Sequence, residues 1–275
     1  MDGVSFKQVD QYALCCVENF SDELKQALRD NLTRICHGAD QASKDRAIYK
    51  YPATIRHFWE ERYSQKTWEE RYSQKTWETR IGMLGELLSH VIILKLFPDF
   101  DVVSPFFNME EKSIRKGFDL LLYENSNNNV WITEVKSGSK GQDKTSCSAT
   151  SALLRLARDD LKKRLAEPEL NHWLNAINAA RNAIHNKANY RDSVIEILEL
   201  EGDLAEENSA TASDNNVFLI SALFSDVSQA IAEQTVSKFT AKLVADSVFK
   251  TVWVLSLHKG TMEKLEEFLR TEAEQ

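Results

Sequence analysis

The stretch that decides the fold reads Gly117-Phe-Asp119-Leu-Leu-Leu-Tyr123, then Glu124-Asn-Ser-Asn-Asn-Asn129, then Val130-Trp-Ile-Thr-Glu134-Val-Lys136-Ser-Gly138. Its two apolar runs are too short for helices and are rich in β-branched and aromatic residues. The Asn and Ser cluster between them is typical of a turn. We therefore predict a β-hairpin over residues 117–138.

The polar residues of this hairpin are expected to converge. Side chains on a strand point alternately to its two faces, so Glu134 and Lys136 should project together, while Trp131 and Val135 project the other way. Asp119 lies at the start of the partner strand, where a buried carboxylate is costly unless a cation binds it. An acid, an acid and a lysine should therefore share one small patch, and a divalent metal would suit them.

These residue types fit the hydrolysis of a phosphodiester. Two carboxylates can hold a hard cation through oxygen, and that cation stabilises the charged phosphate and makes water nucleophilic. The ammonium of Lys136 can neutralise charge on the phosphate or orient and deprotonate the attacking water. The other interpretation is an ordinary surface hairpin with a salt bridge, which explains residues 125–129 equally well.

The order Asp119, Glu134, Lys136 resembles the PD-(D/E)xK nuclease superfamily, which builds its site on a mixed sheet flanked by helices. The resemblance implies an α/β, restriction-endonuclease-like fold. A glutamate on the first core helix often completes the metal site there, and Glu86, in the apolar segment 80–97 that Pro98 ends, occupies that place in chain order. Taken alone, Glu86 fits an ordinary capped or salt-bridged helix residue as well.

Within the superfamily, residues 80–140 resemble the nuclease subunit of the bacterial Hachiman anti-phage systems. The resemblance rests on Gly85-Glu86-Leu-Leu, Gly117-x-Asp119 and Glu134-x-Lys136, on chain length and on a helical segment ahead of the core. It implies an active site of Glu86, Asp119, Glu134 and Lys136. The three acids would hold Mg²⁺, with Mn²⁺ as a substitute, and the partners would be DNA and an ATP-dependent helicase.

Composition indicates an intracellular protein. The chain has 275 residues, 43% of them hydrophobic, and no apolar run approaches the roughly 18 residues of a membrane span. Its start lacks the features of a signal peptide, so we expect it in the cytoplasm, with no membrane partner. Four cysteines without zinc-site spacing are expected to be reduced thiols.

Net charge argues against a protein that grips DNA alone. The chain carries a formal charge of -8, although residues 112–144 contain six basic and four acidic residues. Basic side chains near the hairpin and on the helix predicted over 148–166 could track a phosphate backbone, although a merely solvated face explains the helical ones as well. These candidates are Lys116, Lys140, Lys144, Arg155, Arg158 and Lys162.

We predict a helical segment over residues 1–79 packing on a nuclease core over 80–275. Helices are expected over 6–36, 169–190 and 262–270, and buried strands over 217–224 and 251–258. The acidic stretch around 196–216 is expected to be a loop or insertion and is a candidate docking surface for a basic partner. A nine-residue segment, 60–68, recurs verbatim as 69–77, and we expect this duplication to lie in an exposed helix.

The function predicted is therefore a metal-dependent deoxyribonuclease subunit of a defence complex. Two alternatives remain open. One is a catalytically silent scaffold of the same fold that binds DNA or a helicase. The other is a helical ribonuclease that uses His185 with Arg181, although these two lie one residue closer than is usual for that class.

Overall fold

A single mixed sheet of seven strands organises the described part of the chain. The computed structural model describes residues 1–64, 74–105, 117–167, 170–260 and 262–275. The strands are β1 (Val4–Val9), β2 (Tyr12–Val17), β3 (Phe100–Val102), β4 (Leu120–Glu124), β5 (Asn129–Ser139), β6 (Asn216–Phe224) and β7 (Thr251–Lys259). Their order across the sheet is β1-β2-β7-β6-β5-β4-β3.

Strands β2, β7, β6 and β5 run parallel to one another. At the two edges, β1 pairs antiparallel with β2, β4 with β5, and β3 with β4. The helices are α1 (Asp22–Ala42), α2 (Tyr51–His57), α3 (Gln74–Leu96), α4 (Ser146–Ala166), α5 (Leu170–Ala183), α6 (Arg191–Glu206), α7 (Glu233–Ala245) and α8 (Glu263–Ala273). Short helical turns span Ala47–Tyr49, Phe58–Tyr63 and Ala212–Asp214. The predicted α/β mixed sheet flanked by helices is confirmed.

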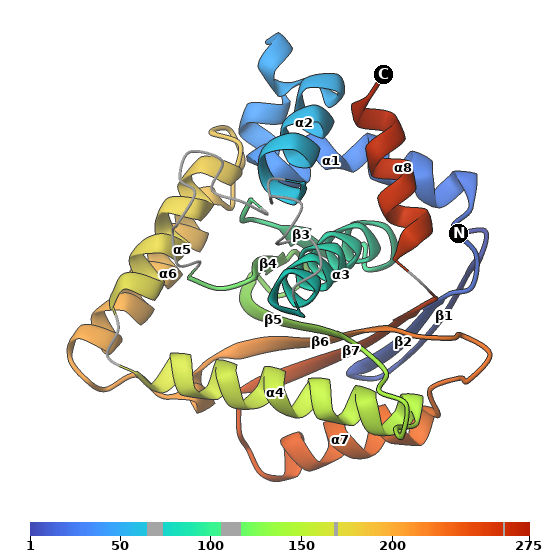
Figure 1. Ribbon diagram of the computed structural model, residues 1–275. Helices are drawn as coiled ribbons and strands as arrows, with labels where there is room; N and C mark the ends of the chain where they lie inside the picture. Colours follow the sequence, from blue (N-terminus) through green and yellow to red (C-terminus); the bar gives the residue numbers. More distant parts are fainter. Residues whose placement is uncertain (65–73, 106–116, 168–169, 261) are drawn as a thin grey trace.

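Helices α1, α2, α3 and α8 lie on one side of the sheet and α4 and α7 on the other, while α5 and α6 run along its side (Figure 1). One apolar cluster joins α1, α2, α3 and α8 to strand residues such as Trp131, Val135 and Phe218. A second cluster joins α4, α5, α6 and α7 to Ile132 and Leu219 on the opposite face. Successive strand residues therefore contribute to different cores, which fixes the register of each strand. Among the described residues, no helix is long and apolar enough to span a bilayer.

The predicted helix over residues 6–36 is wrong in its first part. Residues 4–17 form the β1–β2 hairpin, which turns at Asp10 with φ +46°, and only α1 is helical. Residues 12–17 form a strand because burial alternates along them with a period of two residues. Ala13, Cys15 and Val17 are buried, and the residues between them are partly exposed. Because β2 pairs with β7, the sheet crosses the boundary predicted at residue 79.

The acidic stretch is also different from the prediction, because its first part continues helix α6. Val194, Leu198 and Ala205 recur at helical spacing and are buried against the core beneath α6. Glu196, Glu199 and other acids of the run are exposed on the outer side, which explains why the segment looks unstructured by composition. Only the residues between α6 and β6 form an irregular connection with one short helical turn.

The remaining predicted elements are confirmed with small shifts in their ends. Strands β6 and β7 and helices α4 and α8 lie where the sequence placed them, and α5 covers the first part of 169–190. Strand β3 and helix α7 were not predicted.

The duplicated segment lies partly outside the described residues, since 65–73 are among those that the structure does not describe. In the first copy Tyr63 is 5% exposed, so the expectation of an exposed helix is wrong there. The Tyr63 hydroxyl donates to Glu266 of α8, and Arg80 contacts the same carboxylate.

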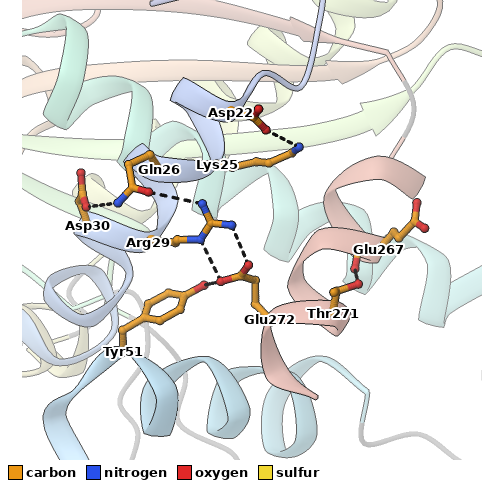
Figure 2. Close-up of polar contacts among 9 residues, drawn as sticks. All are labelled: Asp22, Lys25, Gln26, Arg29, Asp30, Tyr51, Glu267, Thr271 and Glu272. Carbon is orange, nitrogen blue, oxygen red and sulfur yellow. Dashed lines mark hydrogen bonds and ion pairs between the residues drawn. The ribbon is translucent and has the colours of Figure 1, made fainter. Parts of the chain in front are cut away.

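Helix α8 is anchored at its other end by a second acid. Glu272 accepts two hydrogen bonds from Arg29 of α1, at 2.8 and 3.0 Å, and one from the Tyr51 hydroxyl of α2 at 2.7 Å (Figure 2). Leu265 and Leu269 of α8 are buried beneath this contact. The three helices are thus held together by both apolar and charged contacts.

Candidate active site

The register of β4 and β5 brings Asp119 and Glu134 together. Leu120 pairs with Thr133 in an antiparallel ladder, so Asp119, one residue before β4, lies across from Glu134. Directly opposite residues of such a pair point to the same face of the sheet. A side-chain oxygen of Asp119 accepts a hydrogen bond from the backbone N–H of Val135 at 2.8 Å, which fixes its orientation.

Glu134 and Lys136 face helix α4. Ile132, two residues before Glu134, belongs to the core beneath α4, whereas Trp131 and Val135 belong to the core beneath α3. The predicted alternation is therefore confirmed, and Asp119, Glu134 and Lys136 occupy one face.

The carboxylate of Glu134 is buried, with 1% of its side chain exposed, and meets two cations. The Lys136 Nζ lies 2.7 Å from Glu134 Oε1. The guanidinium of Arg164, on α4, contacts Glu134 Oε2 and also donates to the carbonyl oxygen of Gly117 at 3.2 Å. Both oxygens of Glu134 thus carry an ion contact.

Lys136 also pairs with a second acid. Its Nζ lies 2.7 Å from an oxygen of Asp160, which is on α4 one turn before Arg164. Asp160, Lys136, Glu134 and Arg164 therefore form a continuous chain of alternating charge between helix and strand. Neither Asp160 nor Arg164 is among the site residues predicted from the sequence. The only signal is an acid and a base four residues apart beside the buried Leu161 and Leu165, and many solvated helices show the same pattern.

The environment of Glu134 disfavours its charged form. Burial is the main cause that raises the pKa of Glu134 above its usual range, and the nearby charge of Asp119 adds to it. Arg164 and Lys136 act in the opposite direction without outweighing these two causes. For Lys136, burial lowers the pKa, but Glu134 and Asp160 raise it by more. The two opposed carboxylates therefore form a place where further positive charge would be stabilised.

The sequence model of the HamA family matches residues 5–273, nearly the whole chain. The chain belongs to the HamA family. HamA is a subunit of the Hachiman anti-phage defence system, so this chain is an anti-phage defence subunit. A search of curated proteins gave no match.

Glu86 belongs to helix α3, which packs on the face of the sheet opposite to α4. Helix α3 packs on β5 at Ser137, whose side chain alternates with that of Lys136. Gly85 allows this close approach, because a Cβ there would lie 2.8 Å from the Cβ of Ser137 and 3.0 Å from that of Ala222. The structure thus brings together Asp119, Glu134 and Lys136 on the face that α4 covers.

The basic candidates for DNA contact differ in their partners and exposure. Lys116 lies outside the described residues. The others are placed as follows: Lys140 donates to Gln229 at 2.6 Å, Arg158 pairs with Asp159 at 2.7 Å, and Lys144, Arg155 and Lys162 are exposed.

The residues proposed for the alternative ribonuclease site have other partners. Arg181 forms an exposed ion pair with Glu199 at 2.5 Å, and His185 Nδ1 accepts from the backbone N–H of Lys187 at 3.1 Å. Each of the two side chains therefore has a partner outside the pair.

The HamA chain offers two carboxylates for a metal. Within the described ranges, no three His, Cys, Asp or Glu side chains gather as a metal-binding group. Asp119 and Glu134 are nevertheless oxygen ligands of the type that Mg²⁺ prefers, and a magnesium ion commonly uses one or two protein carboxylates and completes its shell with water and substrate phosphate.

Proposed function

We propose that this chain is a metal-dependent deoxyribonuclease subunit of the defence system and that it hydrolyses phosphodiester bonds of DNA. The observation that carries the proposal is the pairing of Asp119 with Glu134 across β4 and β5, with Lys136 on the same face. An ordinary surface salt bridge does not need a second carboxylate opposite a buried one.

Asp119 and Glu134 would hold the metal, Mg²⁺ or its substitute Mn²⁺. The bound ion would supply positive charge that stabilises the phosphate in the transition state and favours ionisation of the attacking water. Glu86 remains a proposed third carboxylate and catalytic residue on the resemblance alone. The hydrogen bond from Val135 to Asp119 would keep that ligand oriented before the metal arrives.

Lys136 would act on the phosphate. Its contacts with Glu134 and Asp160, both at 2.7 Å, hold the ammonium beside the carboxylate pair. From there it can donate to a phosphate oxygen whose negative charge grows during the reaction, or orient the attacking water. A preorganised charge of this kind acts only on the transition state and therefore raises turnover rather than affinity.

DNA binding by this chain would be weak without a partner. The net charge of -8 opposes approach to a polyanion, and the exposed Lys144, Arg155 and Lys162 offset it only at short range. A helicase driven by ATP would raise the concentration of DNA at the site, and its docking surface would be the exposed acids of α6.

One observation favours the alternative, a catalytically silent scaffold of the same fold that binds DNA or a helicase. Both oxygens of Glu134 are already in contact with cations of the chain itself. In a scaffold, Lys136 and Arg164 would neutralise Glu134 in place of a metal ion.

The test is incubation of purified protein with linear, circular and single-stranded DNA, with Mg²⁺ or with a chelator. We expect cleavage that requires Mg²⁺ and is sensitive to salt. Mg²⁺-independent cleavage would contradict the metal site. Intact DNA under all conditions, including with a helicase partner present, would support the scaffold.

A further inference from the structure

Helix α4 supplies Arg164, a basic residue that occupies the place where a cation is expected. The side chain is 20% exposed and its guanidinium bridges two points around the carboxylate pair. One contact is with Glu134 Oε2, and the other is with the carbonyl oxygen of Gly117, two residues before Asp119. The guanidinium therefore contacts the strand segments that carry both proposed metal ligands.

The position of Arg164 is fixed from behind by packing. Leu161 and Leu165, on either side of Arg164 along α4, are fully buried in the core shared with β5 and β6. Gly117 is fixed as well, because a Cβ there would lie 2.4 Å from the carbonyl oxygen of His172 in α5. The backbone at both ends of the Arg164 contact is therefore held by packed elements, which keeps the guanidinium within reach of Glu134.

A divalent cation and this guanidinium cannot share Glu134 favourably. The carboxylate has two oxygens, and Lys136 and Arg164 contact one each. A metal that used Glu134 and Asp119 would replace one of these contacts. It would also bring its two positive charges close to Lys136 and Arg164 around a buried carboxylate, where charge repulsion is strong.

We propose, resting on the function proposed above, that Arg164 is a positioning residue that competes with the divalent metal for Glu134 and so lowers the metal affinity of the site. The ion pair keeps the buried carboxylate compensated when no metal is present. The metal then binds tightly only when the guanidinium leaves Glu134, which needs a rotation of the Arg164 side chain or a shift of α4.

The experiment measures Mn²⁺ affinity by calorimetry on the full chain, together with the shift in melting temperature on adding Mn²⁺. Arg164→Gln should bind Mn²⁺ at least about tenfold more tightly than the wild type, in the range by which residues around metal ligands alter affinity. It should also be less stable than wild type in chelator and gain more from Mn²⁺, because a ligand that binds only the folded state stabilises it.

Two variants keep the test sharp. Arg164→Lys retains the charge but loses the forked geometry, so it should tighten Mn²⁺ binding by a smaller factor and serves if Arg164→Gln does not fold. Lys163→Gln removes the same charge from the neighbouring position, where the side chain is 75% exposed and pairs with Glu167, and should leave Mn²⁺ affinity unchanged.

The outcomes separate the two proposals. Wild-type binding of Mn²⁺ with equal or weaker binding in the Arg164 variants would overturn the role of Arg164 and leave the metal site intact. An equal gain in Lys163→Gln would also overturn it, since general charge would then be the cause. Failure of the folded wild type and of both Arg164 variants to bind Mn²⁺ would overturn the metal site together with this inference.

Discussion

Two acid clusters of this molecule use the same residue types to different ends. Around Glu272, Arg29 and Tyr51 all direct hydrogen bonds at one carboxylate, which joins α8 to α1 and α2 (Figure 2). Around Glu134, an arginine and a lysine meet a carboxylate that has a second acid, Asp119, opposite it. Only the second cluster places two carboxylates side by side.

The pKa values of the two glutamates move in opposite directions. Hydrogen bonds from Arg29 are the main cause that lowers the pKa of Glu272, whereas burial and then Asp119 raise the pKa of Glu134. In the Glu272 cluster, Arg29 and Tyr51 donate hydrogen bonds that stabilise the ionised carboxylate and join three helices. We call these three residues the clamp. In the Glu134 cluster the charged form of the carboxylate is disfavoured, chiefly by burial, and perturbed carboxyl groups of this kind are common at functional sites.

The largest expected difference between the clusters is in catalysis. Glu134→Gln should reduce Mg²⁺-dependent DNA cleavage by at least about a hundredfold, the effect of losing a principal electrostatic group. Glu272→Gln should leave the cleavage rate of the folded protein unchanged. Equal losses in both variants, measured as initial rates on the same DNA, would mean that the comparison does not distinguish a site from a clamp.

Lys136→Ala should separate metal binding from chemistry. We expect turnover to fall by roughly a hundredfold, because a preorganised charge beside the phosphate is lost, while Mn²⁺ affinity stays near that of wild type. Calorimetry and cleavage kinetics on the same preparation check this. A parallel collapse of metal affinity would show that Lys136 mainly holds Glu134 in place.

A smaller effect, on stability, is expected from the clamp. Glu272→Gln should lower the free energy of unfolding by about 1–2 kcal/mol, since it weakens charge-assisted hydrogen bonds to a partly exposed arginine. Urea denaturation, followed by circular dichroism, measures this. The matched change Glu267→Gln, on the exposed side of α8, should cost less than about 0.5 kcal/mol.

The stability contributed by the clamp should depend on pH in a defined direction. Because the pKa of Glu272 is lowered on folding, this stability is fully present above the ordinary glutamate pKa and is lost as pH falls through the lowered value. The difference in unfolding free energy between wild type and Glu272→Gln should therefore be constant above about pH 5.5 and shrink below about pH 4. A difference that grows on acidification would contradict the clamp.

The smallest effect on the folded chain is expected at α6. Replacing the exposed Glu196, Glu199 and Asp203 by serine should change stability by about 0.5 kcal/mol or less, because none of them packs in the core. The same variant should lose capture of a helicase partner in a pull-down from the native host. Undiminished capture would exclude these acids as the docking surface.

The residues that sequence could place are those whose neighbours lie close in the chain. The alternation in 130–136 fixed which way Glu134 and Lys136 point, and the hairpin turn fixed their partner Asp119. Asp160 and Arg164 could not be found in this way, because their role depends on how α4 crosses β5.

The same holds for the fold: elements with a clear local sequence pattern are predicted, and features that depend on distant residues are not. Buried strands such as β6 and β7 are short, continuous apolar runs, and the sequence predicts them. In β1 and β2 the alternation of apolar and polar residues is too short to identify a strand, so most of this segment is predicted as helix. The need for glycine at position 85 could not be predicted from nearby residues either. It follows from the packing of α3 against Ser137, which is distant in the sequence and leaves no room for a side chain.

The most direct test of the account is a Mn²⁺ titration of the wild type and of Asp119→Asn, monitored by electron paramagnetic resonance, with circular dichroism to verify folding. Asp119→Asn keeps the shape of the side chain and removes the second negative charge beside Glu134. We predict that the wild type binds Mn²⁺ at one site and that Asp119→Asn weakens this binding at least about tenfold. Equal Mn²⁺ binding by the two folded proteins would contradict the claim that Asp119 and Glu134 form the metal site.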